Sequence, residues 1–139
     1  MRPWFPWQLD SLWRFGAGVF LVLGATAIGN LLMGMTSLWR IAFLGVVTVV
    51  LAPLVEELVF RGVMFPALVQ LKGRTVGLWG TSILFGLIHF NLFSLLPLIV
   101  MGLLLALLYE RTRNLLAPIA VHAAFNLINF VLVLSGVGQ

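Results

Sequence analysis

Long apolar stretches separated by short charged loops dominate this sequence and limit what it can fold into. Only 9% of the residues are charged and 62% are hydrophobic, whereas roughly a quarter of the residues of a typical soluble domain are charged. So few polar side chains cannot cover a water-soluble globule. We therefore expect an all-α membrane protein with a single domain over residues 1–139. Five candidate transmembrane stretches can be marked, at residues 15–33, 41–71, 75–90, 95–109 and 115–134.

The positions of the basic residues predict how this bundle of about five helices is oriented. In cytoplasmic loops Lys and Arg are enriched. One side of the bundle carries only Arg40, and the other side carries six basic residues: Arg2, Arg14, Lys72, Arg74, Arg111 and Arg113. We therefore expect a cytoplasmic N-terminus in a multi-pass protein of the lipid bilayer, in a prokaryotic cell membrane. The net charge of +4 rests on too few residues to indicate nucleic-acid binding, and the absence of cysteine excludes a thiolate nucleophile.

Ionisable and amide side chains interrupt the apolar stretches. They are Glu56, Glu57, Arg61, His89, His122 and Asn126. Each ionisable group at membrane depth costs a few kcal/mol, so such groups face the interior of a bundle. With a helical rise of about 1.5 Å per residue, they lie about 13 to 24 Å from the charged residues that bound their stretches. Three helices would thus bring polar groups to a similar depth in the membrane. A lone histidine could simply hold helices together, but a set of six favours a polar intramembrane active site.

The spacing of these residues suggests different roles. Glu57 and Arg61 are four residues apart with the acid first, which favours an ion pair on one helix face. That pair would make each charge tolerable in a low dielectric. Glu56 is rotated by about 100° from its neighbour, so its carboxylate can face elsewhere and act as a general base. His122 and Asn126 are also one turn apart and can lie side by side.

The chemistry of this set points to amide hydrolysis without a covalent intermediate. A carboxylate with a nearby imidazole can deprotonate a water molecule for attack on a carbonyl. A second imidazole and an amide can donate hydrogen bonds to the oxyanion that forms. A zinc ion bound by Glu56, His89 and His122 could also activate the water. The residue types alone leave both options open.

Taken in order, these residues resemble three motifs of the CPBP family, which contains CAAX proteases and bacteriocin-processing proteins and is also called Abi. Residues 56–61 match EExxxR, residues 85–89 match FxxxH, and residues 122–126 match HxxxN. The resemblance covers about residues 41–134 and is closest to the type II CAAX prenyl endopeptidases. One such motif is weak, but three in order, each in an apolar helix, are specific.

The resemblance implies an intramembrane endopeptidase. Glu56 and His89 would activate the water, His122 and Asn126 would form the oxyanion hole, and the ion pair described above would support the site. It implies no metal cofactor, with zinc as the alternative. The implied substrate is a membrane-anchored peptide or protein, of which a prenylated CAAX tail is one form.

Two other function classes remain open at this stage. A non-catalytic scaffold, or an immunity protein that binds a bacteriocin-type peptide, could retain the same polar residues. A small proton-coupled transporter could also place Glu and His in a membrane, although transporters commonly contain two related halves and this sequence shows no repeat. The sequence is also compatible with an oligomer.

Overall fold

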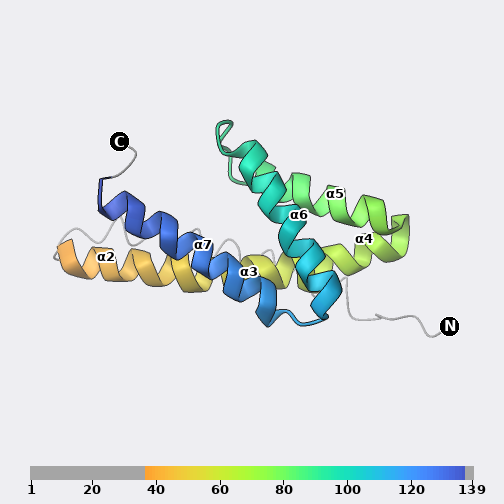
Figure 1. Ribbon diagram of the computed structural model, residues 1–139, viewed down its shortest axis with the longest axis horizontal. Helices are drawn as coiled ribbons and strands as arrows, with labels where there is room; N and C mark the ends of the chain where they lie inside the picture. Colours follow the sequence, from red (N-terminus) through yellow and green to blue (C-terminus); the bar gives the residue numbers. More distant parts are fainter. Residues whose placement is uncertain (1–36, 137–139) are drawn as a thin grey trace. The chain divides into compact units, whose positions relative to one another are not determined.

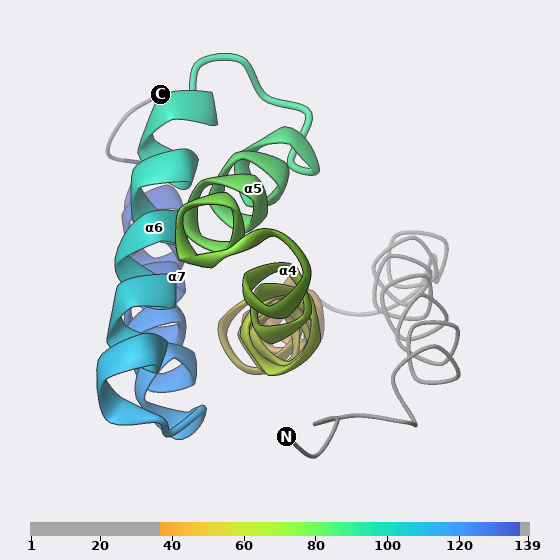
Figure 2. The ribbon, with the colours of Figure 1, turned by 90° about the vertical axis from the view of Figure 1, so that its right-hand side faces the viewer.

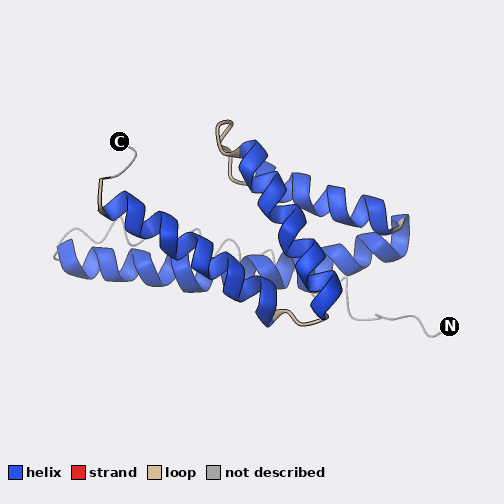
Figure 3. Ribbon diagram, viewed as in Figure 1, coloured by secondary structure: helices blue, strands red, loops and turns tan. Residues whose placement is uncertain are grey.

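The computed structural model describes residues 37–136, and the predicted stretch at 15–33 lies outside them. The described residues form helices joined by short loops, with no strand between residues 37 and 136 (Figure 3). The all-helical fold class predicted from the sequence is therefore confirmed for this part of the chain. The chain divides into two compact units. The described residues of the first are 37–56 and 123–136, and those of the second are 57–122.

The predicted stretch at 41–71 belongs to one helical run, Ser37–Lys72, of 36 residues. It consists of five consecutive segments: α2 (Ser37–Gly45), the π-helical η1 (Val46–Leu51), α3 (Ala52–Glu57), the π-helical η2 (Leu58–Met64) and α4 (Phe65–Lys72). Both π-helical segments close with a hydrogen bond between residues five apart, from the N–H of Ala52 to Val47 and from the N–H of Phe65 to Phe60.

A proline explains each of these wider turns. Pro53 and Pro66 each follow the end of a π-helical segment by two residues. Proline has no N–H, and its ring collides with the carbonyl one turn earlier in a regular α-helix. In membrane helices a local change to π geometry re-satisfies the freed backbone groups. The run therefore continues past both prolines without ending.

The next three helices are α5 (Arg74–Leu87), α6 (Leu95–Thr112) and α7 (Leu116–Leu134). The predictions for α6 and α7 are accurate to three residues or better, but α5 ends three residues before the predicted position 90. At that point Phe90 has a left-handed φ of 50°. The Asn91 side chain then accepts hydrogen bonds from the N–H groups of Phe93 and Ser94. These local bonds turn the chain toward α6, so His89 lies in the loop rather than in a helix.

Three of the described helices are long and apolar enough to cross a membrane: Ser37–Lys72, Leu95–Thr112 and Leu116–Leu134. Helix α5 has 14 residues and is about 21 Å long, which is less than the roughly 30 Å of a hydrocarbon core. The predicted count of five membrane-spanning helices thus stays a prediction.

In the second unit, α5 packs between α4 and α6 (Figures 1 and 2). Its core contains Phe65 of α4, Leu78 of α5 and Ala106 of α6. Small residues let the helices approach closely, as is common where lipid surrounds a bundle. At Gly102 of α6, an added Cβ would lie 3.1 Å from the Cα of Ser82 and 3.3 Å from its carbonyl oxygen. Any larger residue at this position would press on the backbone of α5.

One exposed ion pair joins the start of α5 to the end of α6 in the second unit. Arg74 at the start of α5 donates two hydrogen bonds of 2.8 Å to the carboxylate of Glu110 in the last turn of α6. These hydrogen bonds and the charge of Glu110 raise the pKa of the Arg74 guanidinium. The loops that follow α4 and α6 therefore lie at the same end of the unit, as the charge pattern predicts.

We predict that Gly102→Val lowers the free energy of unfolding by about 1–3 kcal/mol, the usual effect of overpacking, because the new side chain meets backbone atoms of α5. The measurement is thermal unfolding of the purified protein in detergent. Gly80→Val is the matched control, since a Cβ there would meet only the flexible end of Leu68, at 3.5 Å. Equal destabilisation by the two substitutions would contradict the close contact at Gly102.

Candidate active site

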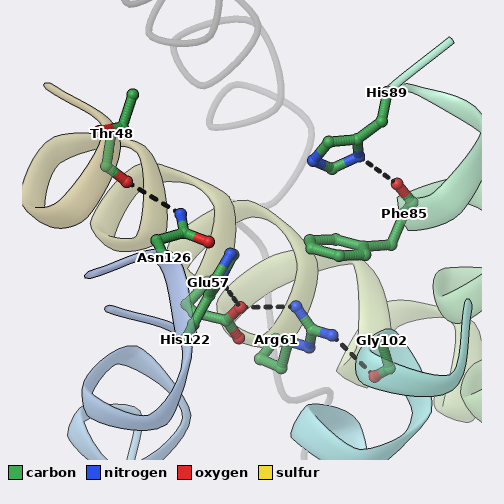
Figure 4. A network of polar contacts seen from close by, with 8 residues as sticks. All are labelled: Thr48, Glu57, Arg61, Phe85, His89, Gly102, His122 and Asn126. Carbon is green, nitrogen blue, oxygen red and sulfur yellow. Dashed lines mark hydrogen bonds and ion pairs between the residues drawn. The ribbon is translucent and has the colours of Figure 1, made fainter. Parts of the chain in front are cut away.

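The ion pair predicted from the spacing of Glu57 and Arg61 is present. Arg61 Nη1 donates to Glu57 Oε1 at 2.7 Å, and both side chains are fully buried (Figure 4). Arg61 Nη2 donates to the carbonyl oxygen of Gly102, also at 2.7 Å. The guanidinium therefore links η2 to α6 at the point where Gly102 lets α6 approach α5. A lysine could not reach both acceptors in this way, because it lacks the planar fork of arginine.

His122 binds to the same carboxylate. Its Nδ1 lies 2.8 Å from Glu57 Oε1, and its side chain is 2% exposed (Figure 4). A carboxylate oxygen accepts hydrogen bonds, so Nδ1 carries the proton. Glu57 thus has two partners on one oxygen, the guanidinium and the imidazole. The sequence analysis missed this second contact because the two residues are 65 positions apart, and no local pattern links them.

The Nδ1 contact determines what the other nitrogen of His122 can do. In a neutral ring with its proton on Nδ1, the Nε2 atom is an acceptor. For Nε2 to donate to an oxyanion, the ring must carry a second proton, and the Glu57 carboxylate would stabilise that positive charge. Glu57 therefore determines the hydrogen-bonding state of His122 as well as supporting Arg61.

His89 is positioned by a similar contact. Its Nδ1 lies 2.8 Å from the carbonyl oxygen of Phe85, one turn earlier in the chain. A carbonyl oxygen only accepts, so Nδ1 is again the donor, and Nε2 of the neutral ring has the lone pair that a general base needs. The last turn of α5 thus fixes the ring although His89 itself lies beyond the helix end.

The side chain of Phe85 is fully buried beside the polar residues. Its ring centroid lies 5.1 Å from that of His89 and 5.6 Å from that of His122. The Arg61 guanidinium carbon lies 5.0 Å from the same centroid, within the range of a cation–π contact. The first residue of the FxxxH motif therefore packs against both histidines and the buried arginine.

The other two predicted site residues belong to the first unit. Asn126 Nδ2 donates to the carbonyl oxygen of Thr48 at 2.8 Å (Figure 4), and the Thr48 hydroxyl donates to the carbonyl of Leu44. An amide nitrogen carries two N–H groups, so Asn126 keeps a second N–H for another acceptor. Glu56 is half-buried near the end of α3. Sequence reasoning did not identify Thr48, which is 78 positions from Asn126.

The ligands predicted for a zinc ion were tested against the described side chains. Between residues 37 and 136, no three His, Cys, Asp or Glu side chains come together as a ligand group. His122 also directs one ring nitrogen to a carboxylate that already binds an arginine, and such a carboxylate contact is compatible with metal binding by a histidine. The choice between a metal-free site and a zinc site therefore stays a prediction.

Comparison with known proteins identifies related chains. The family model for Rce1-like type II CAAX prenyl endopeptidases matches residues 37–128. The putative membrane peptidase YdiL of Bacillus subtilis is 33% identical over 81 residues, which cover 58% of this chain and 33% of that protein. The uncharacterized protein YpbD of the same organism is 37% identical over 71 residues, or 48% of this chain and 33% of that protein. The matched stretch is therefore one third of the length of each relative. No solved structure matches.

We predict that Arg61→Ala lowers the free energy of unfolding by about 3–5 kcal/mol, the usual cost of leaving the partner of a buried ion pair uncompensated. Thermal unfolding in detergent measures the effect. Arg74→Ala provides a matched control, because it removes an arginine from the exposed pair with Glu110, and exposed pairs contribute little. A comparable loss of stability in the two variants would contradict a buried network around Glu57.

Proposed function

The chain belongs to the Rce1-like family of type II CAAX prenyl endopeptidases, and from this premise we propose that it is an intramembrane endopeptidase that cleaves a membrane-anchored substrate. The observation that carries this proposal is the buried network of Glu57, Arg61 and His122. Burying such groups is costly in a membrane protein, and the network fixes the orientation of a histidine that belongs to a family motif. The match to the family model includes every predicted site residue.

The proposed reaction begins with a water molecule. The Glu56 carboxylate takes a proton from the water, and the oxygen of the water attacks the carbonyl carbon of the scissile peptide bond. His89 assists by accepting a hydrogen bond from the water at Nε2, the nitrogen that faces away from its contact with Phe85. The product of this step is a tetrahedral intermediate with a negative oxygen and a protonated Glu56.

Two donors would stabilise that oxygen. Asn126 supplies the amide N–H that is not bonded to Thr48, and His122 supplies Nε2–H from a doubly protonated ring. Glu57 accepts the hydrogen bond of His122 Nδ1 at 2.8 Å and so holds the ring in position for this role.

Collapse of the intermediate completes the reaction. The carbon–nitrogen bond breaks as the proton held by Glu56 passes to the departing nitrogen, which gives an amine and a carboxylic acid. The acid then transfers its proton to the amine, so the final products are a carboxylate and an ammonium group. Atoms and charges balance without any further reactant. Deprotonated Glu56 is restored for the next cycle.

The substrate that we propose is a peptide held at the membrane by a hydrophobic anchor, and a prenylated CAAX tail is the form that the family name suggests. Because the three long helices carry few charged residues, a substrate already anchored in the bilayer can diffuse to them laterally. We further propose the orientation given by the charge pattern, with the N-terminus on the cytoplasmic side.

We predict that Glu56→Gln abolishes cleavage without a change in thermal stability, because glutamine keeps the size of the side chain but cannot accept the proton. The assay uses the purified protein in lipid vesicles with prenylated and unprenylated membrane peptides, and mass spectrometry to identify products. Wild-type turnover in the variant would contradict the assignment of Glu56. A folded wild-type protein that cleaves no peptide would favour a peptide-binding or immunity role.

We predict that Asn126→Ala lowers kcat by a factor of about 100–1000, as is typical for the loss of one oxyanion donor. The affinity for the uncleaved peptide should change little, because the bond strengthens only in the transition state. Kinetics of the same peptide in lipid provide the measurement. An increase in KM with unchanged kcat would show that Asn126 binds the ground state instead.

Metal dependence separates the proposed mechanism from the zinc alternative. With Glu56 and His89 activating the water without a metal, cleavage should survive dialysis against a strong zinc chelator. Activity that disappears on dialysis and returns on addition of zinc would establish the metal mechanism. The Gly80→Val variant is dialysed in parallel to control for loss of folded protein. The thermal unfolding of this variant is compared before and after dialysis.

A further inference from the structure

The loop that joins α5 to α6, residues 88–94, exposes large apolar side chains. Phe90, Leu92 and Phe93 have 95%, 85% and 98% of their surface exposed. Three such neighbours next to a predicted site residue, His89, are unusual for a loop in water, where turns are commonly built from Gly, Pro, Asn, Asp and Ser. The loop thus exposes three large apolar side chains, which favour a nonpolar environment.

The sequence around the loop contains no charge that would hold it in water. No Asp, Glu, Lys or Arg occurs between positions 75 and 109, which includes the loop and all of α5 after its first residue. Charged residues normally mark the points where a chain leaves the lipid. Here they occur only at the opposite end of the two helices, where Arg74 and Glu110 form their ion pair.

The length of α5 places the loop within the hydrocarbon region. The Arg74–Glu110 pair marks the interface at which α5 begins. From there, the 14 residues of α5 rise about 21 Å, so the helix ends before it has crossed a core of roughly 30 Å. The chain turns back at that depth.

Lipid requires the polar groups of irregular backbone to be satisfied internally, and most N–H groups of the loop are. Residues 88–95 have eight backbone N–H groups. Four donate to carbonyl groups close in the chain, those of Ile88, His89, Phe90 and Leu95. The N–H groups of Phe93 and Ser94 donate to the Asn91 side chain. Six of the eight backbone N–H groups, four plus two, are therefore bonded within the protein.

We propose that residues 88–94 form a membrane-immersed loop whose apolar side chains contact the acyl chains of the leaflet farther from the Arg74–Glu110 end. The occupant of this surface is lipid hydrocarbon. The loop is therefore not an aqueous connection, and His89 is reached from the lipid side. This inference depends on the geometry of the hairpin and not on peptidase activity, so its failure would leave the proposed function intact.

Single cysteines allow a direct test because the chain has none of its own. We would label Phe93→Cys with an environment-sensitive NBD fluorophore and reconstitute the full chain in phosphatidylcholine vesicles. Leu104→Cys in α6, where the side chain is 60% exposed, is the lipid-facing control. Lys72→Cys at the end of α4 is the aqueous control. Leu92→Cys is a second probe of the loop, and thermal unfolding confirms that each labelled protein is folded.

Two quenchers decide the outcome. We expect the label at position 93 to be quenched by doxyl-labelled phosphatidylcholine at least half as strongly as the label at 104. We also expect less than half of the iodide quenching seen at position 72. Strong iodide quenching would place the loop in water and overturn the proposal. Quenching by neither reagent would mean that protein covers the loop, and this would overturn it as well.

Discussion

The contact that joins Glu57, Arg61 and His122 is the constraint on which the second unit depends. Removing charged groups from water costs several kcal/mol for each ion, and this chain has few polar groups to offset that cost. A single carboxylate oxygen accepts hydrogen bonds from the guanidinium and from the imidazole. The second guanidinium nitrogen reaches a backbone carbonyl of α6, which is possible only where Gly102 permits a close approach. The buried ion pair and the close packing of the helices therefore depend on each other.

The same residues determine the chemical state of the two histidines. Both rings donate from Nδ1, His122 to a carboxylate and His89 to a backbone carbonyl, and both pack against the buried ring of Phe85. Each contact restrains the orientation of its ring. The proposed roles differ: His122 would donate to the oxyanion, and His89 would accept a hydrogen bond from the attacking water.

Much of the fold could be predicted from the sequence because its signals are local. Apolar length gave the bounds of α6 and α7 to within three residues, and the spacing of Glu57 and Arg61 gave their ion pair. The features that were missed depend on tertiary packing or on backbone geometry. His122 meets Glu57 over a separation of 65 residues, and no pattern in one sequence encodes that contact. The early end of α5 depends on the local hydrogen bonds of Asn91, so hydrophobicity alone extended the helix too far.

A double-mutant cycle between Glu57 and His122 tests the central contact most directly. The free energies of unfolding of Glu57→Gln, His122→Gln and the double variant would be measured together with that of the wild type in the same detergent. Residues in contact couple by about 0.5–3 kcal/mol, whereas distant pairs add to within about 0.5 kcal/mol. The buried carboxylate–imidazole contact predicts a coupling of at least about 1 kcal/mol. Additive losses would show that the two side chains do not act as one network, and would contradict the account of how His122 is held.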